Sequence, residues 1–262
     1  MAVNHSISQF GTTEPFYLQV GRGQVHNHTH VHKYGFNGSV GTGDDTIWFQ
    51  QGDYTWSSAA VKLKISSDNA ADDGDPAGNG ANTVTVQGLD GNYEEISETV
   101  TLDGTTPVET TNTFLRTHRM FVVTAGAGLT NTGVIYAADT GDTYGTPGVP
   151  DTATGIRSTI GAGEGQTLQA FYTIPAGYTG YLLQVAAGSV NGTNATTITL
   201  RTRTEGGAFR TKDKFIVFKD MLTMTYPVPL AIAEKTDIEM KGDAAASTTD
   251  VAANFDLILV KN

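Results

Sequence analysis

The second half of the chain consists of short segments separated by Gly, Pro and Asn. Within each segment, alternate residues would point to opposite faces of an extended strand. In an extended chain, Phe171 and Thr173 fall on one face, and Tyr172 and Ile174 on the other. This period of two is typical of β-strands with two different faces. The predicted strands are residues 167–174, 179–187, 195–203, 209–218, 222–230, 236–242 and 251–260. Strands of this length joined by tight turns predict an antiparallel β-sandwich, and the jelly roll is the arrangement we expect.

The first half of the chain predicts a second, separate group of strands. These cover residues 61–66, 83–89, 96–102, 113–124 and 133–138. No window sustains the apolar spacing of an amphipathic helix, so the fold class is all-β. We expect two antiparallel β-sandwich domains, the C-terminal one jelly-roll-like, with an extended N-terminal arm.

The domain boundaries follow from where this alternation stops. Residues 139–155 contain no periodic hydrophobic positions, which predicts a linker or long surface loop between the domains. The predicted parts are an N-terminal arm with an aromatic segment (1–56), a first β domain (57–138) and a C-terminal β-sandwich (156–262). The alternative is one elaborated sandwich from which 139–155 is only an excursion.

Composition narrows the class of partner. The net charge of −11 opposes binding to phosphate backbones, so we expect no nucleic-acid partner. The chain has no Cys, which removes thiol chemistry and Cys-based zinc sites. No apolar run approaches the roughly 18 residues of a membrane span, and no signal peptide is recognisable. We therefore expect no membrane association, and a protein that stays in the cytoplasm or leaves it within a larger particle.

Four of the six histidines alternate along one segment: His26, His28, His30 and His32. A strand here projects all four from one face. Imidazole is a common ligand of divalent transition metals, so the row predicts a metal site if threefold symmetry brings several copies together. The alternative is a polar or interfacial strand face without a ligand, because no carboxylate or Cys lies close in sequence. We favour the second interpretation and expect no other cofactor.

Aromatic residues are concentrated just before the first β domain. Trp48, Phe49, Tyr54 and Trp56 fall within nine residues. Rings flanked by amides and a carboxylate are suited to binding sugars, because a ring stacks on the sugar face while polar groups bond its hydroxyls. Such clusters are more often the anchor of a core or of a subunit contact. Trp48, Tyr54 and Trp56 are therefore candidates for a partner interface, with glycan binding as the alternative.

Basic residues are concentrated in the C-terminal domain. Six of the sixteen fall within nineteen positions: Arg201, Arg203, Arg210, Lys212, Lys214 and Lys219. On strands, the first two share a face, and so do the next three. A basic face on an acidic protein predicts docking to an acidic partner surface, including another copy of the chain. The alternative is a solvated outer face with local ion pairs.

No catalytic motif emerges from the sequence. There is no Gly-x-Ser-x-Gly elbow, no HExxH motif and no phosphate-binding glycine loop. Glu94, Glu95 and Glu98 offer carboxylates, but a glycosidase needs two that face each other across a cleft. We expect the chain not to be an enzyme.

Several sequence segments resemble those of a family of virion structural proteins of tailed bacteriophages. They are VHKYGFN (31–37), DTIW (45–48), VQGLD (86–90), ISETV (96–100), NTFLR (112–116), GQTL (165–168), IPAG (174–177) and PLAIAEKTDI (229–238). The resemblance covers most of the chain and is least clear at residues 68–80 and 139–155. It carries no catalytic motif.

This resemblance implies a non-catalytic component of the virion, assembled in the host cytoplasm. It points to a capsid cement or decoration protein, a trimer that clamps neighbouring major capsid subunits. In that case the arm 1–56 and the basic strands 201–219 engage the shell, and several linked contacts act together through effective concentration. The alternative is a tail-, neck- or fibre-associated module that binds host glycans.

Overall fold

The alternating segments of the second half form strands where the pattern predicts them. The computed structural model describes residues 14–190 and 194–262. The strands of this half are β10 (Phe171–Thr173), β11 (Tyr178–Ser189), β12 (Thr196–Arg203), β13 (Arg210–Val217), β14 (Met221–Ile232), β15 (Asp237–Ala244) and β16 (Thr249–Lys261). All pairings between named strands are antiparallel, and the predicted all-β sandwich class is confirmed.

These strands form a jelly roll with two strands from the N-terminal region. One sheet has the order β1–β16–β11–β14, where β1 is His28–Val40. The facing sheet has the order β10–β15–β12–β13, and the short β2 (Asp45–Thr46) also pairs with β15. Eight strands in this pair of four-strand orders make the jelly roll. Alternate side chains from both sheets fill its core, among them Phe255, Leu257 and Ile198.

The predicted extended arm at the N-terminus is corrected, because part of it forms the first strand of the jelly roll. Residues 28–40 do not extend away from the domain; they pair with β16 along almost its whole length, from His28 opposite Val260 to Val40 opposite Thr249. The alternation that predicts a strand here is the same feature that lets it complete a sheet. Before it lies a short helix, α1 (Phe16–Gly21), which buries Val20 and exposes Phe16, Tyr17 and Leu18. The part of the predicted arm at 1–13 lies outside the described residues.

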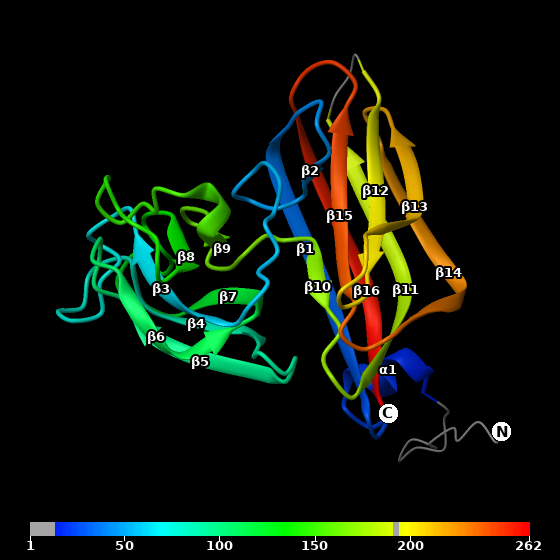
Figure 1. Ribbon diagram of the computed structural model, residues 1–262, viewed down its shortest axis with the longest axis horizontal. Coiled ribbons are helices and arrows are strands. Elements are labelled where there is room, and N and C mark those ends of the chain that lie inside the picture. Colours follow the sequence, from blue (N-terminus) through cyan, green and yellow to red (C-terminus); the bar gives the residue numbers. More distant parts are fainter. Residues whose placement is uncertain (1–13, 191–193) are drawn as a thin grey trace.

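The first β domain is inserted between β1–β2 and β10 of the jelly roll (Figure 1). One of its sheets has the order β6–β3–β8–β9 and the other β5–β4–β7, and buried aliphatic side chains such as Leu63, Val84 and Met120 lie between them. Its strands are β3 (Val61–Ser67), β4 (Ala81–Leu89), β5 (Glu95–Thr101), β6 (Val108–Phe114), β7 (Arg116–Ala125), β8 (Ile135–Asp139) and β9 (Ile156–Ile160). We call this part, residues 57–160, the inserted domain.

Of the two predicted alternatives for residues 139–155, linker or surface loop, the structure shows the loop, and the domain boundary expected there is corrected. Residues 139–155 connect β8 to β9, and these two strands pair with each other in the same sheet, so the segment is a loop within the inserted domain. A short 3-10 helix, Ala153–Gly155, ends this loop. The boundary lies instead between β9 and β10, and the jelly roll takes in residues from both sides of the inserted domain. A loop and a linker look alike in sequence because both lack periodic hydrophobic positions.

Candidate interaction surfaces

The aromatic residues before the inserted domain lie in the interior. Trp48 and Tyr54 are buried, and Tyr54 stacks on Phe171 of β10 with ring centroids 4.2 Å apart. The half-buried Trp56 ring has the guanidinium groups of Arg116 and Arg203 at 5.1 and 5.3 Å from its centroid. The buried rings of Trp48 and Tyr54 cannot stack on a sugar, so the glycan platform predicted from Trp48, Tyr54 and Trp56 together is wrong. The cluster is a core that joins the two domains, as the more conservative interpretation holds.

Two of the predicted docking arginines are neutralised within the chain. Arg201 Nη2 lies 2.8 Å from the Glu239 carboxylate, and Arg203 Nη2 lies 2.6 Å from that of Asp237. The register of β12 on β15 places Arg201 opposite Glu239 and Arg203 opposite Asp237, so the ion pairs are cross-strand pairs. Arg201 and Arg203 therefore do not form the free basic face that the sequence predicts.

The other predicted basic residues do lie on an exposed surface. Arg210, Lys212 and Lys214 are exposed on β13, and no ion pair to any of them is found within residues 14–190 and 194–262. The alternation from Lys212 and Lys214 continues with Ile216, which is 75% exposed, and Phe218, which is 55% exposed, whereas a register shift at Lys212 interrupts it toward Arg210. The surface is named the β13–β14 edge here and comprises Arg210, Lys212, Lys214, Ile216, Phe218, Met221 and Val228.

The apolar part of this edge is not predicted from the sequence. The run from Phe215 to Phe218 is continuously hydrophobic and is typical of a buried strand. Continuing the alternation of Lys212 and Lys214 through this run indicates that Ile216 and Phe218 lie on the charged face. β13 and β14 are each the last strand of their sheet, and among the described residues no further strand pairs with their outer edges. Ile216, Phe218 and Met221 are exposed close together in sequence around the β13–β14 turn, and exposed apolar patches of this kind mark interaction sites.

The histidine row is divided between different partners. His30 Nε2 and His32 Nδ1 lie 2.9 and 2.8 Å from the same oxygen of Asp256, on β16. His28 Nδ1 contacts the backbone oxygen of His26 instead. In the described part of the chain, no group of three or more His, Cys, Asp or Glu side chains is placed to hold a metal ion. A metal site formed by several copies stays a prediction. No carboxylate lies close to the row in the sequence, but the fold places that of Asp256 beside it.

A cleft of about 530 Å³ lies between β1 and the inserted domain. At its base, the amine of Lys33 donates to the backbone oxygen of His118, and the His118 Nε2 accepts from the backbone N–H of Thr173 at 3.3 Å. Burial, with a further contribution from Arg119, lowers the pKa of Lys33 to about 7. Burial, assisted by the charges of Lys33 and Arg116, also lowers the pKa of His118 well below its ordinary value. These groups join the two domains across the cleft.

A second ionic contact fastens the same junction. Arg116 of the inserted domain directs two guanidinium nitrogens at Asp237 of β15, at 2.9 and 3.1 Å. Both side chains are buried, and Asp237 also accepts from Thr173 Oγ1 at 2.6 Å. A bidentate pair of this kind fixes the relative orientation of its two partners.

Among the described residues, no helix is long and apolar enough to cross a bilayer.

Comparison with known proteins gives no family for this chain. No family model matches it, and no curated protein matches it. The structure of the infectious bursal disease virus Gt strain has 12% sequence identity and a TM-score of 0.22, over 95% of this chain and 78% of the other. The crystal structure of the infectious bursal disease virus VP2 subviral particle has 11% identity and a TM-score of 0.20, over 90% of this chain and 73% of the other. TM-scores this low do not establish a shared fold or function.

Proposed function

We propose that this chain is a non-enzymatic structural protein of a tailed-bacteriophage virion, and specifically a trimeric capsid cement or decoration protein. Its role is to stabilise the head by bridging major capsid subunits. The observation that carries the proposal is the β13–β14 edge, where apolar side chains are exposed beside cations that have no ion partner in the described part of the chain. The sequence resemblance to virion structural proteins supplies the class, and the fold alone does not.

The chemistry of the edge sets what it binds. Ile216, Phe218, Met221 and Val228 offer apolar area whose removal from water stabilises a complex by about 25 cal/mol per Å². The neighbouring Arg210, Lys212 and Lys214 favour an acidic surface and speed encounter with it. The expected partner surface on the shell is therefore apolar at its centre and acidic at its rim.

Linked contacts explain how a modest edge holds firmly to a particle. Each copy buries only a narrow strip of two strands. In a trimer, the binding of one edge holds the other two near their sites, so the second and third contacts form at a high effective concentration. Loss of the trimer would then weaken attachment more than its direct contacts suggest.

Co-sedimentation with mature capsids that lack the protein tests the proposal. The double variant Ile216→Ser with Phe218→Ser removes the apolar centre and is expected to reduce capsid binding at least about tenfold, equivalent to about 1.4 kcal/mol. Lys212→Gln with Lys214→Gln is expected to weaken binding mainly at low salt, because exposed charges are screened at higher ionic strength.

Leu129→Ser is the matched control. Leu129 is 88% exposed on the inserted domain, away from the edge, so its loss should leave capsid binding unchanged. Light scattering on the same samples gives the oligomeric state, with a trimer expected. Wild-type protein that does not sediment with capsids would overturn the proposal, as would edge variants that bind as well as Leu129→Ser.

A further inference from the structure

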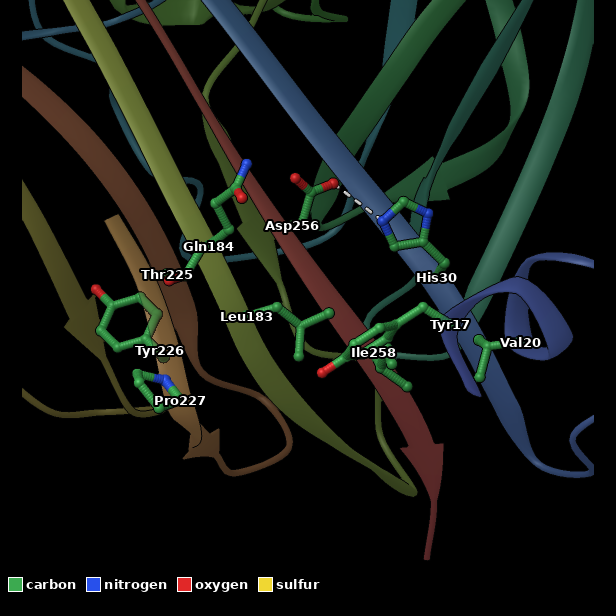
Figure 2. A pocket seen from close by; sticks show the side chains of 10 residues that line it. All are labelled: Tyr17, Val20, His30, Leu183, Gln184, Thr225, Tyr226, Pro227, Asp256 and Ile258. Carbon is green, nitrogen blue, oxygen red and sulfur yellow. Dashed lines mark hydrogen bonds and ion pairs between the residues drawn. The ribbon is translucent and has the colours of Figure 1, made fainter. Parts of the chain in front are cut away.

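A separate hollow lies on the outer face of the β1–β16–β11–β14 sheet, between α1 and β14. Its volume is about 550 Å³, and Figure 2 shows its lining residues. The cause is a departure of β14 from β11: Leu182 pairs with Leu230, but Gln184, two residues on, pairs with Thr225. The intervening residues 226–229 include two prolines, which have no N–H to donate to a neighbouring strand. The displaced segment forms one wall of the hollow, and α1 forms the other.

Polar side chains cross the sheet in register, and all of them except the terminal His32 line this hollow. The strand register aligns His32 of β1 with Asp256 of β16, Asp256 with Gln184 of β11, and Gln184 with Thr225 of β14. This polar ladder presents an imidazole, a carboxylate, an amide and a hydroxyl in sequence. At about 4.8 Å between strands, the ladder is about 14 Å long. Figure 2 shows Asp256 lying between Gln184 and His30.

The ladder keeps hydrogen-bonding capacity for a ligand. His30 and His32 both contact Oδ1 of Asp256, at 2.9 and 2.8 Å, which orients the carboxylate. Within residues 14–190 and 194–262, no partner is found for the other oxygen, Oδ2, or for the side-chain amide of Gln184. A carboxylate oxygen accepts and an amide both donates and accepts, so together they match hydroxyl groups, which do both.

Beside the ladder, the hollow is apolar. Leu183 and Ile258 form its floor, and Ile258 is buried. Tyr17 of α1 stands at the rim with 60% of its surface exposed, so its ring is accessible. The opposite wall is fixed because the Tyr226 hydroxyl donates to Asp213 Oδ2 at 2.6 Å. The lining includes no Lys or Arg, and the chain is strongly acidic, so an anionic ligand is disfavoured.

From this combination we propose that the hollow binds a neutral carbohydrate. The hydroxyls of the sugar bond to Asp256 Oδ2, Gln184 and Thr225, while its C–H face lies on Leu183 and the ring of Tyr17. Pockets with an apolar body and a few convergent polar groups are the usual form of small-ligand sites. The site shares the segment 226–229 of β14 with the β13–β14 edge, but the proposal does not rest on the proposed role on the capsid.

The test uses the full chain on an array of neutral oligosaccharides of glucose, galactose, mannose and N-acetylglucosamine, with sialylated and sulfated chains alongside. Saturation-transfer NMR with the same neutral oligosaccharides in solution detects weaker binding. Binding is expected for neutral chains alone. Tyr17→Ala and Gln184→Ala are each expected to lower the affinity at least about tenfold.

Tyr34→Ala is the matched control. Tyr34 is an exposed tyrosine on the same face of β1 as His30, but it does not line the hollow. Its affinity should stay within about twofold of the wild type. The proposal is overturned by an absence of neutral hits in both measurements, by hits restricted to sulfated or sialylated chains, or by equal loss in Tyr34→Ala and Tyr17→Ala. Because Tyr17 is exposed, its variant is expected to fold normally.

Discussion

The two sides of the jelly roll have opposite surroundings. On one side, the inserted domain lies against β1 and β10 (Figure 1), and the junction buries polar groups in pairs, with Arg116 on Asp237 and Lys33 on the His118 backbone. On the other side, β13 and β14 face outward and carry exposed apolar residues such as Ile216 and Val228, which is 81% exposed. The covered side thus holds buried charges beside the aromatic core of Trp48, Tyr54 and Phe171, while the open side leaves apolar side chains in water, against the usual preference.

This contrast separates two uses of a surface. A buried charge pair contributes little net stability but is strongly destabilising when one partner is lost, so it fixes how the two domains sit. An exposed apolar edge contributes little to the folding of one chain and becomes useful only in a complex. Substitutions on the covered side should therefore change the free energy of unfolding strongly, and substitutions on the open side should change it little.

The largest expected effect on stability comes from removing the buried carboxylate at the junction on the covered side. Asp237→Ala leaves the buried guanidinium of Arg116 and the partly buried one of Arg203 without their carboxylate and removes the acceptor of Thr173. The free energy of unfolding, measured by urea denaturation, is expected to fall by about 3–5 kcal/mol. Glu205→Ala is the control, because it removes only the exposed pair with Lys235 and should cost about 0–1 kcal/mol. Equal losses in the two variants would mean that the junction pair has no special role.

A smaller effect is expected from the buried amine at the same junction. The pKa of Lys33 is 10.5 in the unfolded chain and about 7 in the folded one, lowered by burial and by Arg119. Between these values the unfolded chain holds a proton that the folded chain does not, so stability rises with pH and is lost as the pH falls to 7. We expect unfolding to require about 2 kcal/mol more at pH 9 than at pH 7 from this group.

Lys33→Met tests that pH dependence directly. The variant should lose the part of the pH slope that Lys33 supplies and should be at least as stable as the wild type at pH 7. Lys261→Met, at an exposed site near the C-terminus, should keep the wild-type slope. An unchanged slope in Lys33→Met would show that the amine is solvated in the folded protein.

The strands of the jelly roll are predictable because their signal is local. The expected segments 179–187 and 195–203 correspond to β11 and β12 within a few residues, since alternation and turn residues act over neighbouring positions. The insertion of one domain into the other is not predictable in this way. It depends on His28–Val40 pairing with Thr249–Lys261, and nothing within either segment identifies its partner.

The surfaces are predicted less well for the same reason. Arg201 and Arg203 are correctly placed on one face, but the carboxylates that neutralise them lie on β15, so their pairing depends on register. Trp48 and Tyr54 are correctly identified as a cluster, yet Phe171, which buries them, comes from beyond the inserted domain. The sequence therefore indicates which residues share a face, while the fold decides what covers that face.

The smallest expected effect on stability comes from the open side. Ile216→Ser with Phe218→Ser changes two side chains that already contact water, so the free energy of unfolding should stay within about 0.5 kcal/mol of the wild type. Val217→Ala is the matched change between them, since Val217 lies on the opposite, buried face of the same strand and its truncation should cost about 2 kcal/mol. Thermal or urea denaturation of the three proteins compares neighbouring positions on one strand. If the exposed pair cost as much as Val217, these side chains would be packed within the chain, and the open side would have no apolar surface left for a partner.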